Sequence, residues 1–394
     1  MRIAVVNNFY PPRVGGSAHL SESLAKGYAA RGHEVLVITA AHAGAPALED
    51  VDGIRVVRLP AVTLPRTRLA VNFDIAFCAR PSLPRRVGEL LDAFRPDVLH
   101  QHGQFFDLTW ATGLWARDNG VPAMLSVHTR LESPSRAYQA AFTLLDRFVV
   151  APFMRRYKPT FVVMDVQMRD YIAEKYRGGI SGTVHTPVGI EPARVRGGDG
   201  RLVRERHGIG DAPMILSTGH VISLRDRLTL VEAMPAVLAA LPDARLVVVG
   251  GIYYDAFLRR ARELGVEHAI LATGSVPRTD IPHYLAAADI ECHDLRGYGF
   301  GTASLECMAA GLPVVSAVRE DNFGDIKLID RGNVHLVPEE DPVALARRLV
   351  DALRDPEEAR AIARAGAELV DENFSMEAVL DKHLDALHRL TGQS

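Results

Sequence analysis

Residues 297–311, GYGFGTASLECMAAG, combine a glycine-rich turn with a single carboxylate, which is a pattern that could bind a phosphorylated ligand. Glycines let backbone amides approach a ligand closely. We expect a helix that uses Thr302 as its N-cap, and a helix N-terminus favours an anion such as phosphate. Glu306 lies four residues later on the same stripe of that helix, so it should face the same opening. The alternative interpretation is purely structural: the same residues would form a tight turn followed by an acid near the N-terminal end of the helix dipole.

Two further groups of residues have spacings that resemble metal sites. His100 and His102 lie on one face of an expected strand, and His128 ends the next strand. Histidine is a common metal ligand, but no carboxylate partner is evident in the sequence. We therefore favour the interpretation that these three histidines bind no metal. Asp50 and Asp52 form a DVD sequence next to a glycine, and this place favours a hairpin turn over a metal site.

Composition limits the class of protein. The chain has 394 residues, of which 48% are hydrophobic and 24% charged, as expected for a globular protein of about two domains. The formal net charge of −3 gives no reason to expect nucleic-acid binding. The 3 cysteines suit a reducing compartment. We see neither a signal peptide after Met1 nor an apolar run long enough for a membrane span, and we expect a cytoplasmic protein.

Short β-branched runs alternate with amphipathic helices in both halves of the chain, which predicts two doubly wound α/β domains. The expected strands include RIAVVNN, EVLVIT, DVLHQHG and AMLSVHT in the first half and MILSTGH, ARLVVVG, DIECHD and PVVSAV in the second. We place an N-terminal domain at residues 1–190 and a C-terminal domain at 191–372. A final helix within residues 373–394 should pack back on the first domain. Polar residues follow many of the strands, so ligands should bind at the carboxyl edges of the sheets.

The ordered set of these segments resembles the retaining glycosyltransferases of family GT4. That family has a glycine-rich turn with two glutamates eight positions apart, followed by a helix and a G-x-P-V-V sequence. GYGFGTASLECMAAGLPVV matches this pattern here, with only the second glutamate present. The N-terminal strand with its Gly-Gly loop, the two histidine-bearing strands and the segment ILSTGHVISLRDRLTLVEA match in order. The resemblance implies the GT-B fold, in which two Rossmann-like domains face each other across a cleft. It also implies catalysis without a metal or other cofactor.

The resemblance assigns roles residue by residue. Glu306 matches the carboxylate that accepts hydrogen bonds from the nucleotide ribose, Arg225 matches the lysine that binds the diphosphate, and His128 matches a histidine at the sugar. Together with Arg225 and Glu306, the implied donor-binding residues are Gly15, Gly16, His220, Val276, Tyr298, Gly299, Phe300, Gly301 and Thr302. His128 and Arg225 are the implied catalytic residues.

Four positions depart from the family pattern. Tyr298 stands where the family has its first glutamate, and His220 stands where it has a phosphate-binding arginine. Asp226 replaces a glycine after the phosphate lysine, and Val188 replaces an asparagine. A phenol cannot replace two charged acceptor oxygens. We therefore expect a donor sugar that differs from the usual ones near the hydroxyl that the missing glutamate would bind.

The sequence predicts a retaining glycosyltransferase that moves a sugar from a nucleoside diphosphate donor to a nucleophile of a small-molecule, glycan or lipid acceptor. The alternatives are an epimerase or phosphorylase on the same fold, or an inactive sugar-nucleotide-binding partner protein. Basic clusters at residues 85–86 and 155–158 raise the secondary hypothesis of a weak contact with an anionic membrane surface. The sequence does not give the acceptor, the nucleobase, the sugar or the oligomeric state.

Overall fold

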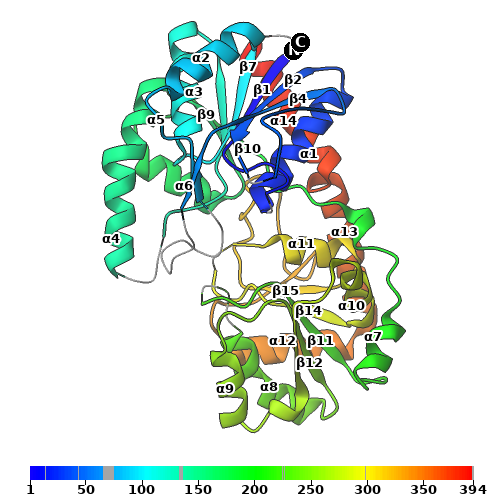
Figure 1. Ribbon diagram of the computed structural model, residues 1–394. Coiled ribbons are helices and arrows are strands. Elements are labelled where there is room, and N and C mark those ends of the chain that lie inside the picture. Colours follow the sequence, from blue (N-terminus) through cyan, green and yellow to red (C-terminus); the bar gives the residue numbers. More distant parts are fainter. Residues whose placement is uncertain are drawn as a thin grey trace. The chain divides into compact units, whose positions relative to one another are not determined.

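The structure is a computed structural model that describes residues 1–13, 15–42, 44–64, 75–132, 136–223, 225, 227–297 and 299–392 (Figure 1). The chain divides into two compact units. Unit 1 consists of Met1–Val188 together with Val379–Ser394, and unit 2 consists of Gly189–Ala378.

The sheet of unit 1 is doubly wound around β1 (Arg2–Asn7). Its strand order is β10-β9-β8-β7-β1-β2-β4-β3, and every pair is parallel except the β3–β4 hairpin. The strands are β2 (Glu34–Ala40), β3 (Leu48–Val51), β4 (Ile54–Leu59), β7 (Val98–His102), β8 (Ala123–Ser126), β9 (Thr160–Val163) and β10 (Gly182–His185). The chain moves outward from β1 in one direction through β2 and in the other through β7, so β1 and β7 form the switch point where ligands of such sheets bind.

The helices of unit 1 connect these strands, as the parallel topology requires. They are α1 (Gly16–Ala30), α2 (Leu83–Phe94), α3 (Asp107–Asn119), α4 (Arg136–Leu145), α5 (Ala151–Tyr157) and α6 (Val166–Lys175), with a π-helical turn η1 (Asp146–Val150) before α5. A separate two-stranded ribbon consists of β5 (Val62–Leu64) and β6 (Ile75–Phe77). In α14 (Met376–Thr391), the residues from Val379 onward belong to unit 1, where Leu380 packs against Gly27 of α1.

The sheet of unit 2 is entirely parallel in the order β13-β12-β11-β14-β15-β16, so its switch point lies between β11 and β14. Its strands are β11 (Met214–Thr218), β12 (Arg245–Val249), β13 (Ile270–Gly274), β14 (Ile290–Cys292), β15 (Val314–Ser316) and β16 (His335–Leu336). Its helices are α7 (Gly200–Arg206), α8 (Leu228–Ala240), α9 (Ala256–Glu263), α10 (Ile281–Ala287), α11 (Thr302–Ala309), α12 (Pro342–Arg354) and α13 (Pro356–Asn373). Short 3₁₀ turns occur at η2 (Pro192–Arg194), η3 (Glu267–Ala269) and η4 (Arg278–Asp280).

The fold class predicted from the alternating pattern is confirmed, and so is the hairpin at the DVD sequence. Asp52 and Gly53 have φ values of 55° and 77°, the positive values that a two-residue hairpin turn needs. β5, β6 and β10 were not predicted, because none is a long apolar run. No described helix is both long enough and apolar enough to cross a membrane.

Candidate functional site

The carboxyl ends of β11 and β14 bring two polar segments of unit 2 together. β11 and β14 pair in parallel, with Leu216 opposite Glu291, and both chains then continue into polar residues. Gly219 and His220 follow β11, and His293 and Asp294 follow β14. This is the switch point of the sheet, where the topology predicts a ligand.

The glycine-rich turn leads from β14 into α11 as predicted, with a shift of one residue. Gly301 is the N-cap and Thr302 is the first helical residue, so the prediction of Thr302 as the N-cap was wrong by one position. Gly299 has a φ of 101°, a conformation in which a side chain would be strained. Thr302 is exposed, and its amide begins the helix without a partner inside it.

Glu306 is a partly buried carboxylate with few partners. Its side chain is 29% exposed, and Arg278 approaches its Oε1 at 3.5 Å, a long contact. Burial raises the pKa of Glu306, and the charge of Arg278 opposes this effect. Because a carboxylate has about four acceptor positions, Glu306 retains the capacity to accept two hydroxyl groups.

Arg225 places its guanidinium beside the backbone of Gly301. A Cβ added at Gly301 would lie 3.0 Å from Nη1 of Arg225, so the glycine is what allows this approach. The Arg225 side chain is 41% exposed, and its Nε lies 3.8 Å from Oδ1 of Asp294. Arg225 is therefore held loosely and presents positive charge at the start of α11.

Asp294 already occupies the anion position at this helix terminus, which the sequence analysis did not anticipate. Its Oδ2 accepts a hydrogen bond of 2.7 Å from the Gly301 amide and one of 3.2 Å from the Ser304 hydroxyl. The side chain is 4% exposed. Burial raises the pKa of Asp294, but His293, Arg225 and the Gly301 amide together outweigh burial and hold the pKa below its usual value.

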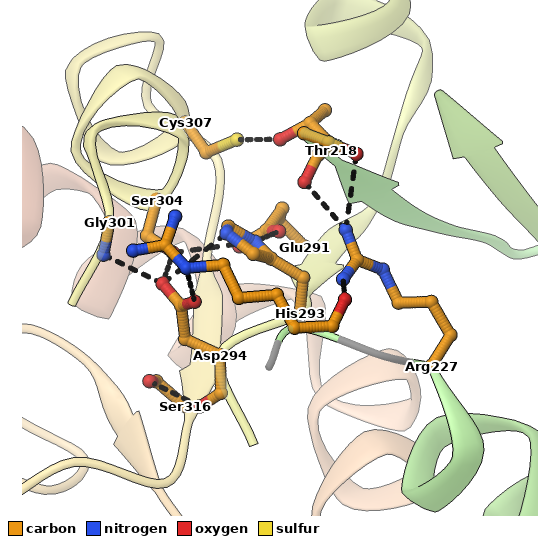
Figure 2. A network of polar contacts seen from close by, with 11 residues as sticks. Thr218, Arg227, Glu291, His293, Asp294, Gly301, Ser304, Cys307 and Ser316 are labelled. Carbon is orange, nitrogen blue, oxygen red and sulfur yellow. Dashed lines mark hydrogen bonds and ion pairs between the residues drawn. The ribbon is translucent and has the colours of Figure 1, made fainter. Parts of the chain in front are cut away.

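Arg227 ties together the two ends of the loop that carries His220 and Arg225 (Figure 2). Its fully buried guanidinium donates to the carbonyl of Arg225 at 2.6 Å and to the carbonyls of Thr218 and Gly219 at 3.0 and 3.3 Å. Burial lowers the pKa of Arg227, and the carboxylates of Asp294 and Glu291 oppose this effect. We call Arg225, Arg227, Glu291, His293 and Asp294 the charge network.

His293 bridges the two carboxylates of the charge network. Its Nδ1 contacts Oε1 of the fully buried Glu291, and its Nε2 lies 3.3 Å from Oδ2 of Asp294. Figure 2 shows His293 between the two acids. Charged residues inside a buried strand such as DIECHD were the available sequence signal for this network, because a buried charge requires partners.

His220 is exposed, and its ring is oriented by the segment that follows β12. Its Nδ1 accepts a hydrogen bond of 3.1 Å from the Gly251 amide. In the neutral ring this leaves the proton on Nε2, which can donate to a ligand oxygen. His220 can thus serve as a hydrogen-bond donor without carrying a charge.

The remaining residues of unit 2 that were predicted to bind the sugar donor include two with buried or partly buried side chains. Phe300 is buried and its ring packs against Phe323, so only its backbone could reach a ligand. Val276 is partly buried and packs against a hydrophobic core of unit 2. Tyr298 and Asp226 lie outside the described residues.

In unit 1, the Gly15–Gly16 turn forms the N-terminus of α1 next to the end of β1. The side chain of Asn7 donates to the carbonyl and hydroxyl of Ser17 at 3.1 Å and thereby anchors the turn. A Cβ added at Gly15 or Gly16 would meet no described atom within 4 Å. The packing of the described residues therefore leaves open space above both glycines.

His128 belongs to a cluster of neutral histidines in unit 1. Its Nε2 lies 3.0 Å from Nδ1 of His102, whose strand position is paired with Asn7 of β1. His100 lies beside His102 and also contacts His383 of α14, with ring centroids 5.2 Å apart. Burial lowers the pKa of His128 to about 4, with a smaller effect of His383. His128 is therefore uncharged at neutral pH and can orient a ligand by hydrogen bonding.

Among the residues that the structure describes, no group of three or more histidine, cysteine, aspartate or glutamate side chains could hold a metal ion. The His102–His128 contact is instead a hydrogen bond in which one ring donates and the other accepts.

Comparisons with known proteins place both units among sugar-transferring enzymes. The family model described as "Glycosyl transferase 4-like domain" matches residues 15–189, and the model described as "Glycosyl transferases group 1" matches residues 201–369. The chain is 25% identical over 98% of its length, and 98% of the relative, to a GDP-mannose-dependent alpha-(1-6)-phosphatidylinositol monomannoside mannosyltransferase of Mycobacterium tuberculosis. It is 24% identical over 96% of its length, and 92% of the relative, to a glycogen synthase of the same species.

Solved structures with similar folds cover nearly the whole chain. The Anabaena protein HepE, solved in complex with UDP, superposes with a TM-score of 0.74 over 99% of this chain and 100% of its own, at 16% identity. Sucrose-phosphate synthase from Thermosynechococcus elongatus superposes with a TM-score of 0.72 over 100% of both chains, at 21% identity. At these identities the likeness establishes the fold.

Proposed function

Because this chain belongs to the GT4 family of glycosyltransferases, which have the GT-B fold and take sugars from nucleotide donors, we propose that it transfers a mannosyl group from GDP-mannose with retention of configuration. The choice of GDP-mannose follows the mycobacterial relatives, which are GDP-mannose-dependent mannosyltransferases, and it replaces the expectation of an unusual donor sugar. The proposed acceptor is a hydroxyl of a glycolipid, as in those relatives.

The proposal assigns one task to each part of the site. The bond between the anomeric carbon and the diphosphate oxygen breaks, and the acceptor oxygen bonds to that carbon from the same face. The departing phosphate oxygen takes the acceptor's proton, so no protein base and no metal is needed. Arg225 and the Nε2–H of His220 stabilise the charge on the leaving diphosphate. Neutral His128 orients the sugar.

The observation that carries the proposal is the arrangement of Arg225, Gly301 and Glu306. The guanidinium of Arg225 lies beside Gly301 at the N-terminus of α11, and Glu306 lies one turn along that helix. One helical turn advances by about 5–6 Å. A diphosphate at the arginine would thus leave the adjoining ribose within reach of the carboxylate.

Calorimetric titration with GDP, UDP, ADP and dTDP tests the donor assignment. We expect saturable binding of these diphosphates, with GDP the tightest. In a separate transfer assay, we expect a lipid-linked acceptor to receive mannose only from GDP-mannose. Tighter binding of UDP than of GDP would overturn the assignment of guanine as the nucleobase, and it would leave the proposal of a glycosyltransferase standing. Failure of all four diphosphates to bind would overturn the proposed site.

A basic and apolar surface on unit 1 suits an acceptor that resides in a membrane. No residue of α4 is buried, and the side chains of Leu144 and Phe148 are 56% and 64% exposed. The acidic Asp146 of this segment is buried between the hydroxyls of Tyr171 and Tyr176. The exposed charges from α4 to the C-cap of α5 are therefore basic: Arg136, Arg147, Arg155, Arg156 and Lys158.

We expect this surface to bind anionic lipid vesicles and to release them at high salt, because exposed charges are screened. Cosedimentation with vesicles containing phosphatidylinositol should exceed that with phosphatidylcholine alone. Phe148→Ser should lower the bound fraction several-fold, since an exposed aromatic side chain loses its apolar contact. Val343→Ser, at an exposed apolar residue of unit 2, is the matched control. Equal sedimentation of wild type with both vesicles would contradict the assignment.

A further inference from the structure

We propose that Asp294 is a positioning residue that acts as a resident anion at the start of α11 and holds Arg225 in place for the donor diphosphate. This inference rests on the proposed function, because it concerns the step in which the diphosphate leaves. It adds a carboxylate to a site for which the sequence analysis predicted only cationic and neutral phosphate ligands.

The hydrogen bonds of Asp294 place its charge where a phosphate would otherwise bind. Its Oδ2 receives the Gly301 amide at 2.7 Å and the Ser304 hydroxyl at 3.2 Å. The N-terminus of a helix stabilises a negative charge because unpaired amides and the helix dipole point at it. A buried carboxylate satisfies this terminus permanently, whereas a ligand does so only when bound.

The same carboxylate limits where Arg225 can lie. Its Oδ1 is 3.8 Å from Nε of Arg225, a distance that allows attraction without a close hydrogen bond. Arg225 is partly exposed, whereas Asp294 is almost completely buried. The buried partner is therefore Asp294, and the partly exposed guanidinium lies near Gly301 with its outer edge available to a ligand.

The rest of the charge network keeps Asp294 from moving. His293 contacts it on one side, and the backbone carbonyl of Asp294 accepts hydrogen bonds from Ser316 Oγ at 2.9 Å and the Ala317 amide at 2.8 Å (Figure 2). Arg227 donates a hydrogen bond to the carbonyl of Arg225 and thereby holds its backbone. The side chain of Arg225 is thus the part of this arrangement that can turn toward a diphosphate.

Two opposite effects on the reaction follow from this geometry. The negative charge of Asp294 repels a diphosphate in the ground state, which weakens binding. It also holds Arg225 where charge develops on the leaving group, which raises turnover. Removing the charge should therefore tighten diphosphate binding, because the repulsion is lost. It should also lower kcat, because Arg225 is no longer held where charge develops on the leaving group.

The test compares Asp294→Asn with wild type, with inorganic pyrophosphate and GDP as calorimetric ligands and kcat measured at saturating GDP-mannose. We expect Kd for both ligands to fall by roughly three- to tenfold and kcat to fall by about the same factor. A residue that only supports the fold would weaken binding and turnover together. Unchanged or weaker binding of both ligands to Asp294→Asn would overturn the proposal.

Ser304→Ala is the matched control, because it removes a hydrogen bond to the carboxylate and keeps the charge. Its Kd for pyrophosphate should stay within about twofold of wild type. If Asp294→Asn does not fold, Asp294→Glu carries the test: it retains the charge but displaces it, so kcat should fall without tighter pyrophosphate binding. Tighter pyrophosphate binding to Ser304→Ala or to Asp294→Glu, which both retain the charge, would contradict the proposal. If wild type binds pyrophosphate but no nucleoside diphosphate, the proposed function fails, and the pyrophosphate Kd values still test the role of Asp294.

Discussion

Arg225→Met should lower kcat by about 100- to 1,000-fold, the usual loss when one donor to a developing negative charge is removed. The guanidinium lies beside Gly301, and in the proposed reaction it stabilises the diphosphate as the glycosidic bond breaks. Methionine retains much of the stem of the side chain and removes the charge. The measurement is the initial rate of transfer from GDP-mannose over a range of donor concentrations.

Arg260→Met is the matched control for this prediction. The Arg260 side chain is 40% exposed, close to the 41% of Arg225, but it pairs with Glu232 and Glu263 on the outer helices α8 and α9. Its replacement should leave kcat within about twofold of wild type, since surface ion pairs contribute little. An Arg225→Met enzyme with kcat close to that of wild type would remove Arg225 from the mechanism.

Glu306→Gln should weaken GDP binding by about 10- to 100-fold, the range for losing hydrogen bonds to a charged acceptor. The carboxylate has only a long contact with Arg278 in the structure and can accept both ribose hydroxyls. The sharpest measurement compares GDP with its 2′,3′-dideoxy analogue. Wild type should discriminate strongly between the two ligands, and Glu306→Gln should discriminate weakly. Equal discrimination by both proteins would remove the ribose assignment.

The same substitution should raise Tm at neutral pH while it impairs binding. Burial raises the pKa of Glu306 in the folded protein, so the ionised carboxylate costs stability at pH values above its folded pKa. That cost disappears as the pH falls below the usual glutamate pKa, where the group is protonated in both the folded and unfolded states. The Tm difference between Glu306→Gln and wild type should therefore be largest at neutral pH and shrink in acid. A constant difference across this range would contradict the burial effect.

The Glu306 prediction depends on a local sequence pattern, whereas the Arg225 prediction depends on a contact between distant parts of the chain. The positions of Thr302 and Glu306 on one stripe of α11 follow from helical periodicity, and the structure confirms this helix. The approach of Arg225 to Gly301 was expected only through the family resemblance, because no local pattern connects segments so far apart in the sequence. The structure supplies that contact directly.

The contacts of the charge network could not be predicted from the sequence. The strand predicted at DIECHD is confirmed over Ile290–Cys292, which form β14. Its acids had no predicted role, because strand periodicity says which face a side chain occupies and nothing about its partner. Arg227 was likewise unassigned, although its fully buried guanidinium contacts three carbonyls. A buried charge can be interpreted only when its partners are known.

The sequence by itself determined the local features: the alternation of apolar strands with helices, the Asp52–Gly53 hairpin, and the glycine turn that leads into α11. These depend on backbone dihedral preferences and on periodicity over a few residues, which neighbouring residues set. Only the tertiary structure decided that Asp294 occupies the start of α11 and that His383 of α14 joins the histidines around His128. Those contacts join segments that are distant in the chain, and they form because sheet topology and packing bring particular side chains to one place.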